Sequence, residues 1–279
     1  MSYTWNSEPP PDMPRIKPSG WARVALRGMA IVCLLGVGVF VSGLTRLVER
    51  QLYTTRRPWT APITRITLGM VLRVIGLRLK TKGRPMRQPG AVVANHVSWL
   101  DILALHACQT VVFVSKSEVS GWPGIGFLAR FVGTVFINRA PREARVQRDI
   151  LADAMRNGAR LMLFPEGTST DGMRVLPFKS TLFEMMLMSD TSADLHVQPV
   201  SVIYDPPQGK EDTRIYAWWG EMDLGPHLAM ILSLARQGCV TVIFHEPLKT
   251  ADFMNRKALA QAAEMAVRAG MPEERRARY

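Results

Sequence analysis

A histidine and an aspartate that together can handle a proton stand five positions apart in the heptapeptide NHVSWLD, at His96 and Asp101. Imidazole is the side chain most easily tuned to take a proton near neutral pH. A carboxylate on its other ring nitrogen fixes the tautomer and stabilises the imidazolium. These residues are the candidate general base and the group that orients it.

The flanking residues predict where this pair lies. The apolar run Ala91–Ala94 reads as a buried strand, and the residues from Ile102 to His106 read as one face of a helix, so the heptapeptide forms a strand-to-helix turn. Positions five apart on a regular helix lie about 140° apart. The two side chains therefore meet only if the histidine is in the turn and Asp101 in the first helical turn. Ser98-x-x-Asp101 is also a capping-box pattern, so Asp101 can alternatively cap the helix.

The composition favours a membrane partner. The chain has 279 residues, 47% hydrophobic content and a formal charge of +12, which suits an anionic surface. Nucleic-acid-binding modules are not recognisable, so nucleic acid is not an expected partner. The three cysteines and five histidines show no ligand spacing, so neither a disulfide framework nor a metal site is predicted.

The N-terminal quarter predicts membrane docking. Residues 1–20, rich in proline and polar residues, are expected to be a disordered tail. Residues 28–44 carry no charge, and a helix of that length spans about 25 Å, the short limit for a bilayer. Arginines lie on both sides of this run, and this symmetry favours a half-buried hairpin with both ends cytoplasmic over a single crossing. The alternative is a buried core helix. A second helix, Ile63–Ile75, is expected in the interface, so residues 21–76 form a membrane-docking helical pair.

Residues 77–250 alternate between strand and helix patterns, which predicts an α/β sheet domain. Strands are expected at residues 77–82, 91–94, 110–115, 134–137, 161–164, 197–204, 214–219 and 240–244. Residues 251–279 are expected to form a C-terminal helix and a charged tail.

Three further stretches combine chemistry with strand ends: GTVFINR, FPEGT and QPVSV. The first ends in Arg139, whose guanidinium suits a phosphate or carboxylate, or is a solvated surface charge. The second places a carboxylate, a glycine and a hydroxyl at a turn, as Glu166, Gly167 and Thr168. Glu166 can alternatively accept backbone N–H groups at that turn. Pro199 in the third stretch shapes the chain at a strand.

Taken in order, NHVSWLD, GTVFINR, FPEGT and QPVSV resemble the four motif blocks of the glycerolipid acyltransferase family, which includes the 1-acylglycerol-3-phosphate acyltransferases. The resemblance covers roughly residues 77–248, and the order and spacing of the blocks make it specific. It implies a mixed, mostly parallel sheet flanked by helices. It also implies a lysolipid acceptor and an acyl-CoA or acyl-carrier-protein thioester as co-substrate, with no cofactor.

The resemblance also implies roles for single residues. His96 is the general base that deprotonates the acceptor hydroxyl, and Asp101 orients it. The hydroxyl attacks the thioester carbonyl directly, without an acyl-enzyme. Arg139 and the turn 166–168 bind the acceptor head group, and Pro199 shapes the site behind the thioester.

One departure from the family pattern bears on the acceptor. Members that form phosphatidic acid read EGTRS in the third block, whereas this chain has EGTST, with Ser169 in place of the arginine. Because a guanidinium is the natural partner of a phosphate monoester, its loss disfavours lysophosphatidic acid. The run FPEGTSTDGMRVLPFKS resembles the bacterial lyso-ornithine lipid acyltransferases, which esterify the 3-hydroxyl of an amide-linked fatty acid. Arg174 or Lys179 can still contact a phosphate, so 1-acyl-sn-glycerol-3-phosphate remains the alternative acceptor.

Acceptor and product both live in the bilayer, and the thioester arrives from the cytosol. The expected location is therefore the inner membrane, with the catalytic domain facing the cytosol. Two other function classes remain open. A non-catalytic basic membrane adaptor would not need the His96/Asp101 pair, and a thioester hydrolase would be expected to carry a G-x-S-x-G elbow, which the chain lacks.

Overall fold

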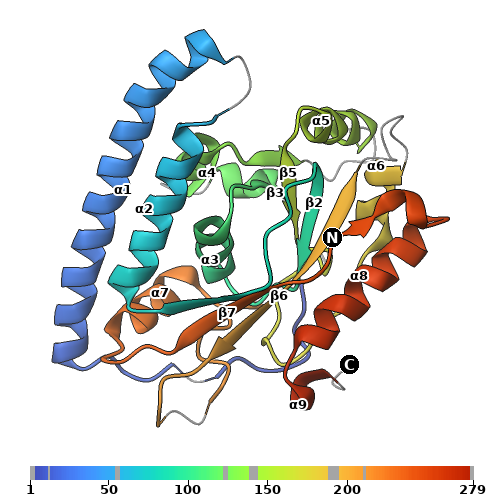
Figure 1. Cartoon of the computed structure of the whole chain (residues 1–279). Coiled ribbons are helices and arrows are strands. Elements are labelled where there is room, and N and C mark those ends of the chain that lie inside the picture. The colour runs from blue at the N-terminus through green and yellow to red at the C-terminus, as the bar shows by residue number, and fades with distance from the viewer. Residues whose placement is uncertain are drawn as a thin grey trace.

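The computed structural model describes residues 4–11, 13–53, 57–121, 125–137, 144–187, 195–209 and 212–276 (Figure 1). Its strands form a sheet in the order β1-β7-β6-β2-β5-β3-β4, and β8 pairs with β6. The strands are β1 (Arg78–Lys82), β2 (Gly90–Ala94), β3 (Val112–Lys116), β4 (Val135–Ile137), β5 (Arg160–Leu163), β6 (His196–Asp205), β7 (Cys239–Phe244) and β8 (Leu248–Lys249). The α-helices are α1 (Pro18–Leu52), α2 (Thr60–Ile75), α3 (Leu100–Cys108), α4 (Ile125–Val132), α5 (Ala144–Arg156), α6 (Glu184–Leu187), α7 (Leu224–Ser233), α8 (Arg256–Gly270) and α9 (Glu273–Arg276).

The sheet is mixed and mostly parallel, as predicted. Strand β2 pairs in parallel with β5 on one side and with β6 on the other, while β6 pairs antiparallel with β7 and β8. All five residues of β2 are buried. Because the carboxyl ends of parallel neighbours meet at one edge, the turn after β2 and the loop after β5 lie together.

Side chains alternate along β2 between two apolar layers. Val92 and Ala94 face one cluster, and Ala91 and Val93 face the other. The first cluster includes Leu72 of α2, Leu105 of α3 and Ile231 of α7, and the second includes Met155 of α5, Met186 of α6 and Leu259 of α8. Figure 1 shows α2, α3 and α7 on one side of the sheet and α8 on the other. This burial on both faces explains the uninterrupted apolar run of β2.

Helix α1 is one continuous helix of 35 residues, about 52 Å long. The charge-free run therefore does not turn back within itself, so the expectation of a hairpin there is wrong. Its large apolar side chains are mostly exposed, among them Val32 at 70% and Phe40 at 67%, and the helix is long and apolar enough to cross a membrane. The alternative of a buried core helix is therefore wrong. Its first turns dock on α7, where Arg23 and Arg27 donate to backbone carbonyls of residues 232–234.

Helix α2 lies between α1 and α3 (Figure 1). Its residues Val71, Leu72 and Ile75 are buried in the core, whereas Ile66 is 57% exposed. The helix therefore joins the apolar α1 to the sheet domain, and its place in the membrane interface stays a prediction.

Gly38 lets α1 and α2 approach closely, because a Cβ atom there would lie 2.7 Å from the side chain of Thr67. We expect Gly38→Ile to lower the free energy of unfolding by about 1–3 kcal/mol through overpacking. Gly36→Ile is the matched control, since nothing lies within 4 Å of a Cβ at that position. Urea unfolding in detergent measures both variants. Equal stability of the two variants would contradict the close contact.

Two expectations about the chain fail. Residues 4–11 are not a disordered tail, because Trp5 is 3% exposed and belongs to the core. Residues 214–219 are not a strand, although their apolar and aromatic side chains predicted one. There the Tyr216 hydroxyl accepts the N–H of Gly238, and the N–H of Trp218 donates to the carbonyl of Val97. These long-range hydrogen bonds hold the segment in turns.

Candidate active site

His96 and Asp101 meet as the spacing required. Nδ1 of His96 lies 2.8 Å from Oδ2 of Asp101. The histidine follows the carboxyl end of β2, and the aspartate lies in the first turn of α3. The His96 side chain is 20% exposed and the Asp101 side chain is fully buried. With Nδ1 held by the carboxylate, Nε2 is the nitrogen that can take a proton from a ligand.

Asp101 both orients the histidine and caps the turn. Its Oδ2 accepts the N–H groups of Val97 at 2.7 Å and Ser98 at 3.0 Å, in addition to the imidazole. The bond to Ser98 is the backward half of a capping box. The Asp101 carboxylate therefore makes the contacts that both interpretations of the Ser98-x-x-Asp101 pattern require. Its Oδ1 accepts the hydroxyl of Tyr204 at 2.8 Å.

Two further contacts fix the turn and the imidazole ring. The amide of Asn95 donates to the carbonyl of Val202 at 2.9 Å and accepts the Val202 N–H at 2.8 Å. This pair of bonds ties the turn to the neighbouring strand β6. The His96 ring stacks on Phe164, with centroids 4.0 Å apart and planes 15° apart. The imidazole therefore has little freedom to rotate away from Asp101.

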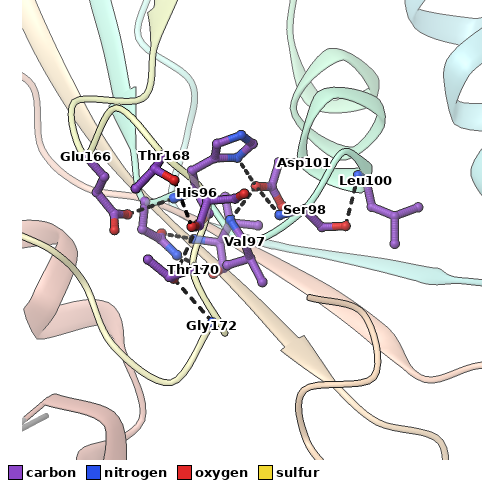
Figure 2. Close-up of polar contacts among 12 residues, drawn as sticks. His96, Val97, Ser98, Leu100, Asp101, Glu166, Thr168, Thr170 and Gly172 are labelled. Carbon is purple, nitrogen blue, oxygen red and sulfur yellow. Dashed lines mark hydrogen bonds and ion pairs between the residues drawn. The ribbon is translucent and has the colours of Figure 1, made fainter. Parts of the chain in front are cut away.

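Glu166 holds the histidine from the other side (Figure 2). Its Oε1 accepts the N–H of His96 at 2.8 Å, and its Oε2 accepts the N–H of Leu176 at 2.9 Å. The side chain is 1% exposed. The N–H of Thr170 also donates to the His96 carbonyl, at 2.9 Å. The structure thus favours the alternative role of Glu166, in which its carboxyl group binds backbone and positions His96.

Burial raises the pKa of Glu166 to about 8, although the N–H groups of Leu176 and His96 act in the opposite direction. Its pKa in the native state therefore exceeds the ordinary value of 4.5. The resulting stabilisation is complete below pH 4.5 and is lost as the pH rises toward 8. We expect the stability of the wild type relative to Glu166→Gln to fall by roughly 1 kcal/mol per pH unit between pH 5 and 8.

Urea unfolding of the two proteins in detergent across this pH range measures the effect. Glu246→Gln, at an exposed position, is the control. A stability difference that stays constant with pH would contradict the raised pKa of Glu166.

The other predicted site residues are placed as follows. Gly167 has φ +73°, and its lack of a Cβ makes room for the Lys179 amine. The Thr168 hydroxyl accepts the N–H of Trp5 at 3.3 Å. Pro199 is buried in β6 opposite Val93. Its role behind the thioester stays a prediction. Arg139 lies outside the described residues.

Sequence reasoning missed Tyr204, Phe164 and Asn95 as parts of this site. Phe164 and Asn95 lie inside quoted motifs, and Tyr204 follows the fourth motif in an apolar strand. A lone tyrosine at the end of a buried strand is the only local signal for such a contact. Among the residues that the structure describes, no group of three or more His, Cys, Asp or Glu side chains could hold a metal ion.

Comparison with known proteins fits this geometry. The family model described as Acyltransferase matches residues 74–203, which include both the His96 turn and the Glu166 loop. A lyso-ornithine lipid O-acyltransferase from Rhodobacter capsulatus is 51% identical over 96% of this chain and 97% of its own length. The chain belongs to the acyltransferase family.

Other relatives of this acyltransferase differ in the acceptor they are named for. A lyso-ornithine lipid O-acyltransferase from Brucella abortus is 38% identical over 76% of this chain and 82% of its own length. A 1-acyl-sn-glycerol-3-phosphate acyltransferase from Neisseria meningitidis is 32% identical over 75% and 81%. The crystal structure of PlsC, the 1-acyl-sn-glycerophosphate acyltransferase of Thermotoga maritima, matches with a TM-score of 0.62 at 21% identity, covering 93% of this chain and 99% of that one. That likeness confirms the fold.

Proposed function

We propose that this acyltransferase esterifies the hydroxyl of lyso-ornithine lipid with a fatty acyl group taken from an acyl thioester. The catalytic part of the proposal is carried by one observation, the bond of 2.8 Å between His96 Nδ1 and the buried Asp101 carboxylate. That bond leaves Nε2 to act as the base, on a side chain that is 20% exposed.

The acceptor is inferred from similarity and from one substitution. The R. capsulatus relative, named for lyso-ornithine lipid, matches nearly the whole chain at 51% identity. Ser169 stands where phosphatidic-acid-forming members carry an arginine. Arg174, a possible substitute, already pairs with Glu8 and Asp171 at 3.2 and 3.1 Å. These features favour an ornithine head group over a phosphate monoester.

The reaction balances with one base and no acyl-enzyme. Nε2 of His96 takes the proton from the acceptor hydroxyl as its oxygen attacks the thioester carbonyl. Asp101 stabilises the imidazolium that forms. When the tetrahedral intermediate collapses, the C–S bond breaks and the imidazolium returns the proton to the leaving thiolate. The products are the ester and a free thiol of coenzyme A or acyl carrier protein.

The membrane context follows from α1. Its outward face carries large exposed apolar side chains, among them Leu26, Val32, Phe40 and Leu47. We place these residues against the lipid phase, where the acceptor resides. The thioester donor is soluble in the cytosol, so we assign the sheet domain to the cytosolic side of the inner membrane.

The similarity to the Neisseria enzyme keeps phosphatidic acid formation as the second candidate. The test supplies the purified protein in lipid vesicles with a labelled acyl thioester and, side by side, lyso-ornithine lipid and lysophosphatidic acid. Products are identified by mass. The proposal predicts faster acylation of lyso-ornithine lipid, and faster formation of phosphatidic acid would overturn the acceptor assignment.

A further inference from the structure

The segment before the first helix is fixed against the catalytic domain. The Trp5 ring lies 6.1 Å from the ring of Trp219, centroid to centroid. The indole N–H of Trp219 donates to the carbonyl of Glu8 at 3.1 Å. Asn6 lies against Gly220, where a Cβ would meet its side chain. Burial of a tryptophan and a hydrogen bond therefore anchor residues 5–8 to the segment that contains Trp219 and Gly220.

The same segment also contacts the loop between Glu166 and Leu176. The backbone N–H of Trp5 donates to the Thr168 hydroxyl at 3.3 Å. The guanidinium of Arg174 lies over the Trp5 ring, 5.0 Å from its centroid, a cation–π contact. Arg174 Nη2 also bonds Glu8 at 3.2 Å and Asp171 at 3.1 Å. Segment and loop are thus joined at two points, the Thr168 hydroxyl and the Arg174 side chain.

The opposite side of that loop carries the catalytic histidine. Both backbone groups of His96 bond to the loop, its N–H to Glu166 and its carbonyl to the N–H of Thr170. Gly172 packs closely on Val97, since a Cβ there would lie 2.8 Å from the valine side chain. Figure 2 shows this loop beside the His96 turn. A shift of the loop would therefore move the histidine relative to any bound substrate.

We propose that residues 5–8 are an active-site clamp, in which Trp5 and Glu8 hold the loop 166–176 so that it positions His96 for proton transfer. Trp5 is a positioning residue in this scheme, because it acts through Thr168 and Arg174. The clamp rests on the proposed acyl-transfer activity, but it does not depend on which lysolipid is the acceptor.

The clamp also gives Arg174 a structural role in holding the loop, in place of a role in binding the head group. A residue that binds a head group should present free donors to a cleft. The Arg174 side chain is instead 12% exposed over the Trp5 ring, its Nε is buried, and its Nη2 is shared between two carboxylates. The two roles predict different kinetics. Loss of a clamp lowers kcat, and loss of a head-group contact raises the KM for the lysolipid.

The first experiment compares the full-length wild type with Trp5→Ala, Trp5→Phe and Met13→Ala in vesicles. The alanine variant is expected to lose about 10- to 100-fold in kcat per folded molecule, with both KM values within about twofold, because small misplacements of a base are costly. The phenylalanine keeps a ring under Arg174 and should restore kcat to within about threefold. Met13 is exposed, lies before α1 but outside residues 5–8, and serves as the control. A kcat within twofold of wild type for Trp5→Ala would overturn the clamp.

Variants at Arg174 test the clamp if Trp5→Ala fails to fold. Arg174→Gln breaks the same clamp and should lower kcat to a similar extent, without raising the KM for the lysolipid. The double variant Trp5→Phe/Arg174→Gln should have a kcat no lower than that of Arg174→Gln alone, because both changes act on one contact. A raised lysolipid KM with unchanged kcat would make Arg174 a head-group ligand and overturn the proposal.

Discussion

Replacing His96 with alanine is expected to lower kcat for acyl transfer by about 10²- to 10⁴-fold, the usual contribution of a general base. Its backbone bonds to Glu166 and Thr170 do not involve the imidazole, so the turn should persist. The KM values and vesicle binding should therefore change little. The measurement is steady-state transfer of a labelled acyl group.

His196→Ala is a suitable control for this variant, because His196 is a partly exposed histidine at the start of β6, the end of that strand away from the site. Near-full activity of His96→Ala would remove His96 from the mechanism. A loss of folded protein, seen by circular dichroism, would instead assign the ring a structural role against Phe164.

Asp101→Asn is expected to lower kcat by a similar 10²- to 10⁴-fold, while the protein stays folded. The asparagine carbonyl can replace Oδ2 and still accept the N–H groups of Val97 and Ser98. Its NH₂ group would face Tyr204, whose hydroxyl can turn from donor to acceptor. What is lost is the negative charge that stabilises the imidazolium.

Comparison with Asp101→Ala separates the loss of the negative charge from the loss of the backbone hydrogen bonds. It removes the same charge but also leaves two buried backbone N–H groups without an acceptor, at a cost of about 1–3 kcal/mol each. We therefore expect only the alanine variant to unfold at clearly lower temperature. If the asparagine variant keeps more than a tenth of wild-type kcat, Asp101 serves the turn and not the reaction.

The His96–Asp101 pair could be predicted because everything that forms it is local. A buried strand, a five-residue spacing and a capping pattern restrict the turn to a conformation in which the two side chains meet. The sheet was predictable for a similar reason, since continuous apolar runs such as β2 require cover on both faces.

Contacts across long stretches of sequence were not predictable. Tyr204 reaches Asp101 across 103 positions, and Trp5 reaches Thr168 across 163. A proline-rich N-terminus has the composition of a disordered tail, and only the tertiary fold supplies the pocket that buries its tryptophan. The same holds for residues 214–219, whose apolar and aromatic side chains predicted a strand and whose hydrogen bonds run to Gly238 and Val97 instead.

The length of α1 was underestimated for a related reason. A charge-free window marks the apolar part of a helix and not its ends. Arg23 and Arg27 lie outside that window yet extend the helix, because their guanidinium groups bond carbonyls at the end of α7.

His96, oriented by Asp101, is proposed to deprotonate a lysolipid hydroxyl so that its oxygen takes the acyl group directly from the thioester. The most direct test follows thiol release and product mass after mixing the enzyme with a labelled acyl thioester, with and without lyso-ornithine lipid. We expect thiol release to require the acceptor and the label to appear in doubly acylated ornithine lipid. Thiol release without acceptor, with label in free fatty acid or on the protein, would contradict direct transfer.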